Sequence, residues 1–150
     1  MRILACGAWD PLHRGHVSLF QRAKMDYPHS SLFVMCPDSS IIELYKGRRE
    51  LIPFKDRLAI LDSIRYVDKV VPVHHGLLVS NGDRSIPTSA DILAILIEKY
   101  EIDCIILDSA HGFLLTLFQH KGIKVVTFPR HPGVSSSEIY ANLQSKGDIE

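Results

Sequence analysis

The stretch that decides the fold is residues 7–16, which read GAWDPLHRGH. It follows an apolar run at residues 3–6 and precedes a helical pattern of apolar side chains. A strand, a glycine-bearing turn and a helix start, in that order, suit a phosphate, because N–H groups at a helix N-terminus are unpaired and the helix dipole favours negative charge. His13 and His16 add side-chain donors there, and Gly15 lets a ligand approach the backbone. The stretch therefore predicts an anion site at the first strand–helix junction.

Apolar runs and helical patterns alternate along the rest of the chain. The expected strands are Arg2 to Cys6, Leu32 to Cys36, Lys69 to Val73, Cys104 to Leu107 and Val125 to Phe128. The expected helices are His16 to Met25, Ser39 to Tyr45, Phe54 to Ile64, Ser89 to Tyr100, His111 to His120 and Ser136 to Leu143. Strands rich in Val, Ile and Leu with little polar alternation are typical of a parallel sheet covered on both faces. The order predicts an α/β fold: a single Rossmann-like, doubly wound domain over residues 1–150, with a five-stranded parallel sheet.

Composition narrows the class of protein. The 150 residues are 46% hydrophobic and 23% charged, values typical of one globular domain, and the formal net charge is zero. A neutral chain has no overall field to attract nucleic acid or an acidic membrane, and no window approaches the roughly 18 apolar residues needed to span a bilayer. The three cysteines lack metal-site or disulfide spacing and are expected to be core thiols. We therefore expect a cytoplasmic protein that binds neither nucleic acid nor membrane.

A basic cluster follows the second expected strand, at residues 46–49 (KGRR), with Arg57 and Arg65 further on. Basic loops are most often solvated faces. Lys46, however, comes soon enough after the strand to return over the carboxyl edge of the sheet. A flexible cationic loop in that place would neutralise charge on a triphosphate.

Two further segments follow strands at the same edge. Residues 130–138 read RHPGVSSSE, in which Ser135 and Glu138 form a helix-start capping box, and serines beside Arg130 form a second anion site. The segment from His74 to Thr88 is an irregular stretch of about 15 residues, long enough to be functional. It is interpreted either as a substrate-side lid that sets selectivity or as a tolerated insertion.

Three of these segments together resemble a known family. Residues 7–16 resemble the G-x-F-D-x-x-H-x-G-H signature (HxGH motif) of the nucleotidyltransferase superfamily, with Trp9 in place of Phe and Ala8 in place of Thr. Residues 46–68 resemble its K-G-x-x, R-x-x-x-L and R-Y-V-D segments, and residues 130–137 its R-T-P-G-[IV]-S-[ST]-[ST] motif with His131 in place of Thr. The combination is similar to cytidylyltransferases acting on glycerol phosphate or ethanolamine phosphate, and more loosely to adenylyltransferases.

The resemblance implies transfer of a nucleoside monophosphate, CMP from CTP in preference to AMP from ATP, onto a small phosphomonoester or phosphonate, with release of pyrophosphate. It implies Mg²⁺ carried by the triphosphate, no dedicated metal site on the protein, and a homodimer. The residues it assigns to catalysis are His13, His16, Lys46 and Arg130. Those it assigns to nucleotide binding are Gly7, Ala8, Trp9, Asp10, Gly15, Asp108, Ser135 and Ser136.

Some alternatives stay open. After the fourth strand the family commonly has G-x-D or G-D-D, whereas this chain reads Leu107-Asp108-Ser109, so only one carboxylate is kept. Asp10 either helps the chemistry or fixes the turn. The alternative functions are an adenylyltransferase using ATP with FMN or a sugar phosphate as acceptor, and a non-catalytic nucleotide-binding homologue. Retention of both histidines, Lys46 and Arg130 favours an enzyme.

Overall fold

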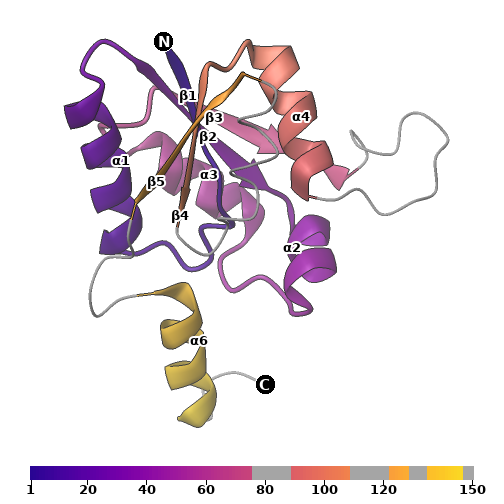
Figure 1. The fold of residues 1–150 in the computed structure, drawn as a ribbon. Helices are drawn as coiled ribbons and strands as arrows, with labels where there is room; N and C mark the ends of the chain where they lie inside the picture. The colour runs from indigo at the N-terminus through magenta and orange to yellow at the C-terminus, as the bar shows by residue number, and fades with distance from the viewer. Residues whose placement is uncertain (76–88, 109–121, 129–134, 147–150) are drawn as a thin grey trace, which may run out of the picture.

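The computed structural model describes residues 1–75, 89–108, 122–128 and 135–146, and its sheet has the predicted architecture. The strands are β1 (Arg2–Ala5), β2 (Ser31–Pro37), β3 (Lys69–Val73), β4 (Cys104–Asp108) and β5 (Lys124–Phe128). The helices are α1 (Arg14–Asp26), α2 (Ser39–Lys46), α3 (Phe54–Asp62), α4 (Ser89–Tyr100) and α6 (Ser136–Ser145). All strand pairs are parallel, in the order β3-β2-β1-β4-β5 (Figure 1). The five-stranded parallel sheet is therefore confirmed, and the expected helix at residues 111–120 lies outside the described residues.

Successive side chains of each strand point to opposite faces of the sheet, and this divides the core into two layers. Leu4 of β1 packs in a cluster with Ile41 of α2 and with Ile92 and Leu96 of α4. Its neighbours Ile3 and Ala5 face the other way, into a cluster with Phe20 of α1 and Leu61 of α3. Because successive side chains of a strand point to opposite faces, an uninterrupted apolar strand needs helices on both sides. Figure 1 shows these helices flanking the sheet. Among the described helices, none is long and apolar enough to cross a bilayer.

Strand order determines where a ligand site belongs. The chain winds from β1 outward to β3, then returns to place β4 directly beside β1, with Ile3 paired to Cys104. In open parallel sheets, ligands bind beyond the carboxyl ends of the strands at the point where the winding reverses. The turn after β1 and the end of β4 flank that point, as the sequence predicts.

The start of α1 differs from its predicted position. The helix begins at Arg14, not at His16, because the His13 side chain caps it. Histidine is outside the usual capping set of Ser, Thr, Asp and Asn, so the sequence pattern gave no signal for this cap. The two histidines therefore lie on the cap and first turn of the helix, one above the other.

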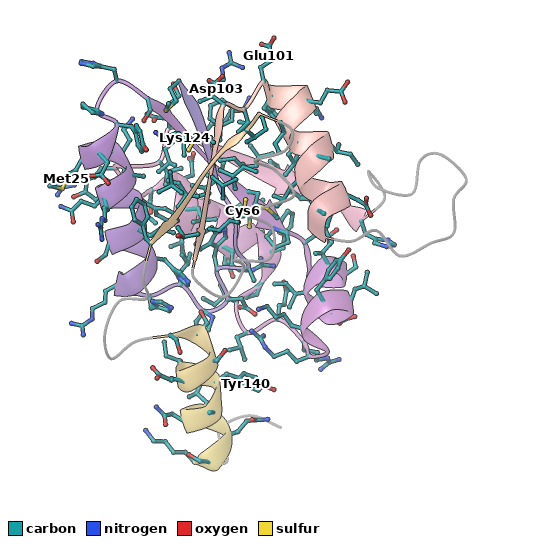
Figure 2. The ribbon with its side chains drawn as sticks, viewed as in Figure 1. Cys6, Met25, Glu101, Asp103, Lys124 and Tyr140 are labelled. Atoms are coloured by element: carbon teal, nitrogen blue, oxygen red, sulfur yellow. The ribbon has the colours of Figure 1, made fainter. Side chains whose placement is uncertain are left out.

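The amino edge of the sheet is tied together by polar contacts far from this turn. Asp68, which ends the R-Y-V-D segment, accepts hydrogen bonds from the Leu32 N–H at 2.7 Å and from Lys24 Nζ at 2.7 Å. Burial alone would raise the pKa of Asp68, but these hydrogen bonds outweigh it and the pKa lies below its ordinary value. Asp103, Glu101 and Lys124 lie at the same edge, at the opposite end of the molecule from Tyr140 of α6 (Figure 2). Asp68 therefore joins α1 to β2.

Asp68→Asn should lower the stability of the fold without changing the site. The neutral amide weakens both hydrogen bonds, so we expect the free energy of unfolding to fall by about 1 kcal/mol in urea denaturation at pH 7. Asp62→Asn, an exposed carboxylate on α3, is the matched control and should leave it unchanged. Equal stability of the two variants would contradict the structural role of Asp68.

Candidate active site

In the turn between β1 and α1, the side chains of two histidines accept hydrogen bonds from backbone N–H groups. His13 Nδ1 accepts from the Gly15 N–H at 3.1 Å, and His16 Nδ1 accepts from the His13 N–H at 3.3 Å. A neutral imidazole that accepts through Nδ1 carries its proton on Nε2. The hydrogen-bond partners therefore assign the Nε2–H tautomer to both rings. In this tautomer each ring carries one N–H donor, on Nε2.

These bonds change how the helix start meets an anion. The sequence led us to expect unpaired backbone N–H groups there, but the Gly15 N–H is bonded to His13 Nδ1 and the His16 N–H to the His13 carbonyl at 3.0 Å. The expectation was wrong for these two groups, because a side-chain cap satisfies the donors that a helix start otherwise leaves open. The imidazole Nε2–H groups lie at the same helix end, whose dipole favours anions.

Both imidazoles are held in a stack. Their ring centroids are 3.7 Å apart with 23° between the planes. Burial first, and the repulsion of any positive charge on His13 second, lower the pKa of His16 to about 3. His16 is therefore a neutral hydrogen-bond donor throughout the physiological pH range.

The ring of Trp9 packs against the ring of His16. Its indole Nε1–H donates to the Met35 carbonyl of β2 at 2.6 Å, and its ring meets that of His16 edge to face at 4.9 Å. The ring leaves no room for a side chain on Gly7, where an added Cβ would lie 2.9 Å from it. Gly7 and Trp9 thus have clear structural roles, and their predicted contacts with a nucleotide stay predictions.

Asp10 joins the turn to the loop that follows α2. Its buried carboxylate pairs with Arg48 at 2.8 Å and accepts from the N–H groups of Leu51 and Ile52 at 2.9 and 2.7 Å. Arg48 also donates to the Asp10 carbonyl at 2.7 Å. Of the two roles left open for Asp10, the structure supports that of fixing the turn, and a role in the chemistry stays a prediction.

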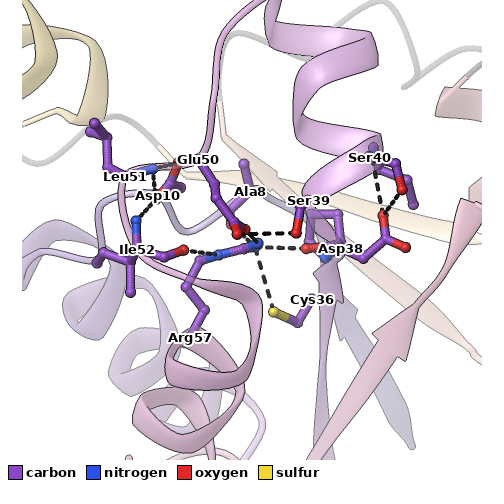
Figure 3. A network of polar contacts seen from close by, with 12 residues as sticks. Ala8, Asp10, Cys36, Asp38, Ser39, Ser40, Glu50, Leu51, Ile52 and Arg57 are labelled. Atoms are coloured by element: carbon purple, nitrogen blue, oxygen red, sulfur yellow. Dashed lines mark hydrogen bonds and ion pairs between the residues drawn. The ribbon is translucent and has the colours of Figure 1, made fainter.

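Arg57 of α3 is the centre of the second buried ion pair. Its side chain is 0% exposed and pairs with Glu50 at 2.7 Å (Figure 3). The guanidinium also donates to three backbone carbonyls, those of Ala8, Pro37 and Ile52, at 3.2, 2.7 and 2.9 Å. It therefore binds the histidine turn, the end of β2 and the loop after α2 to one another.

The thiol of Cys36 lies 3.7 Å from the same guanidinium. Burial raises the pKa of Cys36 to about 11, although the charge of Arg57 acts in the opposite direction. The neutral thiol adds no charge to the pair between Arg57 and Glu50.

The last helix also reaches the turn. Ser135 caps α6 by accepting from the Glu138 N–H at 3.1 Å, which confirms this half of the predicted capping box. Ser136 donates its hydroxyl proton to the Pro11 carbonyl at 2.9 Å, and Arg48 stacks on the Tyr140 ring at 4.8 Å. Segments 7–16, 46–57 and 135–140 therefore converge, as the sequence predicts, and Ser135 keeps its own hydroxyl proton for a ligand.

Two arginines of the basic cluster have less freedom to contact a ligand than the sequence led us to expect. Arg48 pairs with the buried carboxylate of Asp10 and Arg57 with the half-buried one of Glu50, so the expectation of a flexible cationic loop was wrong for them. Lys46 is exposed at the end of α2 and makes no hydrogen bond or ion pair with other described residues. Arg130 lies outside the described residues. Asp108 ends β4, at the carboxyl edge beside β1.

The start of the irregular segment is anchored at the same edge. Asp38, which caps α2, accepts from the His75 N–H at 3.3 Å and pairs with His74 at 3.5 Å. Burial alone would raise the pKa of Asp38, but hydrogen bonds from Ile41, Ser40 and His75, together with nearby His74, hold it below its ordinary value. Residues 76–88, on which the interpretation as lid or insertion depends, lie outside the described residues.

Sequence reasoning missed the roles of Glu50 and Arg57. One signal was present, because Arg57 lies four residues before buried Leu61 and so on the apolar face of its own helix. A charged residue on such a face needs a partner, and Glu50 was a candidate.

In the described part of the chain, no group of three or more His, Cys, Asp or Glu side chains could hold a metal ion.

Several known proteins have sequences similar to that of this chain. Residues 4–142 match the family described as "Cytidylyltransferase-like". A glycerol-3-phosphate cytidylyltransferase of Staphylococcus aureus is 24% identical over 97% of this chain and 96% of its own length. One from Bacillus subtilis is 34% identical over 47% of this chain, and an FAD synthase of Pyrococcus horikoshii is 35% identical over 47%. These two matches span about half of each relative, 53% and 47%.

Solved structures similar to this chain support the fold alone. A lipopolysaccharide core biosynthesis protein from Thermoplasma volcanium has a TM-score of 0.60 at 21% identity, over 87% of this chain and 96% of its own. A macrolide-efflux protein from Streptococcus pneumoniae has a TM-score of 0.64 at 16% identity, over 99% of this chain and 54% of its own.

Replacing Arg57 should cost much of the stability of the domain. In Arg57→Met the carboxylate of Glu50 is left without its cation and three carbonyls lose a donor, so we expect a loss of about 3–5 kcal/mol in urea denaturation. Arg57→Lys, which keeps the charge but not the fork of donors, should fall between this variant and the wild type. Arg65→Met, at an exposed arginine, is the control. Wild-type stability of Arg57→Met would contradict the role of Arg57.

Acid should destabilise the fold through His16. The folded pKa of about 3 lies below the ordinary value of 6.5. The unfolded chain therefore binds more protons between these values, and the free energy of unfolding falls as pH decreases from 6.5 toward 3, at most by about 1.4 kcal/mol per pH unit from this group. His16→Asn should show a correspondingly smaller slope in denaturation at pH 4 to 7, whereas His29→Asn, at an exposed histidine, should keep the wild-type slope. Identical slopes in all three proteins would refute the assignment.

Proposed function

The chain belongs to the cytidylyltransferase-like family, and we propose that it transfers a nucleoside monophosphate from a nucleoside triphosphate to a small phosphorylated acceptor. The observation that carries this proposal is the stacked pair of imidazoles at the start of α1, which the hydrogen bonds of the turn hold in the Nε2–H form. Two donors side by side on the positive end of a helix dipole suit the oxygens of a polyphosphate.

The proposed reaction exchanges one phosphorus–oxygen bond for another. A phosphate oxygen of the acceptor attacks the α-phosphorus of the triphosphate, the bond from that phosphorus to the α,β-bridging oxygen breaks, and pyrophosphate leaves with the electron pair. The attacking oxygen is already anionic at neutral pH, so a strong general base is unnecessary. Catalysis then consists of in-line positioning and of stabilising charge on the α- and β-phosphates.

The four predicted catalytic residues, together with Ser135 and Asp108, have a place in this scheme. His13 and His16 donate hydrogen bonds to the triphosphate. Lys46 and Arg130 neutralise the departing pyrophosphate, and Ser135, whose own hydroxyl proton is uncommitted, donates to a phosphate oxygen. Asp108 lies at the carboxyl edge, where it would meet the nucleoside or the acceptor.

Mg²⁺ is proposed to arrive with the triphosphate. Asp10 is occupied by Arg48 and by two backbone N–H groups, so the histidine turn offers the ion no unused carboxylate. Phosphate oxygens and water can complete its coordination, which suits the octahedral preference of this ion. The bound ion would supply positive charge to the phosphates. The protein's part is to hold the phosphates in line.

CTP is the proposed nucleotide, because the full-length match is to a glycerol-3-phosphate cytidylyltransferase and the R-Y-V-D segment is present in this chain. The similarity of about half the chain to an FAD synthase supports ATP as the second candidate, with FMN as acceptor. Phosphorylated acceptors are common to both reactions. The two candidates differ in the base and in the acceptor.

A pyrophosphate-release assay with each of the four nucleoside triphosphates separates the candidates. We expect turnover with CTP and Mg²⁺ in the presence of glycerol 3-phosphate, ethanolamine phosphate, choline phosphate, a sugar phosphate or a phosphonate. Turnover with ATP and FMN alone would replace the cytidylyltransferase proposal by the adenylyltransferase one. Binding of a triphosphate without turnover under any condition would indicate the non-catalytic homologue.

His16→Ala and His13→Ala test the donor role. Each removes one hydrogen bond to the triphosphate, so we expect turnover with every nucleotide to fall by roughly 10²–10³ while the circular dichroism of the fold is kept. His29→Ala, at an exposed histidine distant from the turn in sequence, is the matched control and should turn over at the wild-type rate. Wild-type turnover of His16→Ala would refute the phosphate role.

A further inference from the structure

Trp9 lies inside the turn, where its side chain is almost entirely shielded from solvent. Its side chain is only 2% exposed, and its indole N–H is bonded to Met35 of β2. The residue has a φ of +56°, a left-handed conformation that is strained for an L-residue and persists where the surroundings enforce it. The hydrogen bond to Met35 and the ring contact with Phe20, at 5.0 Å, are contacts that enforce it.

The ring of Trp9 is directed at His16. Their centroids are 4.9 Å apart at an angle of 88°, while the other contact of His16 is the stacked ring of His13. His16 is thus confined between two aromatic rings. Gly7 leaves open the volume that the Trp9 ring fills, since an added Cβ would lie 2.9 Å from it.

We infer that Trp9 is a positioning residue: its ring, fixed to the backbone of β2, holds the imidazole of His16 against that of His13 and excludes water from it, so that His16 stays in the Nε2–H donor form. The reciprocal bond between His16 Nδ1 and the His13 N–H requires this neutral tautomer, because a protonated Nδ1 has no lone pair to accept with. Trp9 therefore maintains the capping box by keeping His16 dehydrated.

The electrostatics of His16 agree with this geometry. The first cause of its low pKa is burial, and the second is His13, which faces it from the preceding turn. Among the described residues no other titratable or charged group contributes to its shift. Removing the Trp9 ring, which shields His16 from water, should therefore move the pKa of His16 back toward 6.5.

The test is the titration of His16 in the full-length protein by nuclear magnetic resonance of ¹⁵N-labelled histidine, with His16→Asn used to assign the signals. In the wild type we expect an Nε2–H tautomer that does not titrate between pH 5 and 8. In Trp9→Leu the pKa should rise by about one unit or more, because water reaches the ring. Trp9→Phe should keep the low pKa, since a ring remains, although stability falls with the bond to Met35.

Two further variants separate this effect from loss of stability. Gly7→Ala forces the Trp9 ring to shift and should raise the pKa of His16 by a second route. Ile106→Val, in the same apolar cluster, should leave it unchanged. An unchanged His16 titration in both Trp9→Leu and Gly7→Ala would overturn the inference.

The inference rests on the proposed function only for its effect on turnover. There, the acid limb of kcat/KM for the triphosphate should move to higher pH in Trp9→Leu than in Ile106→Val. An unmoved acid limb in an active Trp9→Leu enzyme would contradict the positioning role. If no triphosphate were turned over, the proposed function would fail, while the titration of His16 would still decide the role of Trp9.

Discussion

A single guanidinium determines how the parts of this site meet. The turn after β1, the end of β2 and the loop after α2 all present backbone carbonyls toward Arg57, at the edge where parallel strands end. An arginine has five N–H donors in a rigid fork and can satisfy several such carbonyls at once. Its charge is balanced by Glu50, so it can remain away from water. The backbone that carries the histidines is thus fixed from beneath by α3.

The two buried ion pairs hold the loop after α2 in complementary ways. One pair joins a carboxylate of the turn, Asp10, to a cation of the loop, and the other joins a carboxylate of the loop to Arg57 of α3. Residues 48–52 are therefore attached by charge and by backbone hydrogen bonds. Two arginines that resemble phosphate ligands in the sequence are engaged in holding the loop in place. The donors proposed to meet the phosphates at the turn are the imidazoles of His13 and His16.

The sequence predicted the fold closely because strand alternation and the order of elements are local properties. The five strands, the position of the turn and the membership of the family follow from residues 2–6 and 7–16 and from the later segments. Helix ends were predicted less well where an unusual cap decides them, as His13 does for α1. The partner of Arg48 could not be predicted, because Asp10 is distant in the sequence and local pattern does not encode such a contact. For Arg57 the helix face indicated that a partner was needed, but the pattern did not single out Glu50.

The stacking of His13 on His16 favours neutral imidazoles at this turn. Two imidazolium charges 3.7 Å apart would repel each other by roughly 4–5 kcal/mol at an effective dielectric constant of about 20. Confinement beside Trp9 adds a desolvation cost to any charge on His16. In the proposed reaction, a donor that stays neutral would keep its geometry when the charge of a bound phosphate changes. The turn would then direct the phosphates through hydrogen bonds, and the positive charge would come from Lys46, Arg130 and the Mg²⁺ carried by the triphosphate.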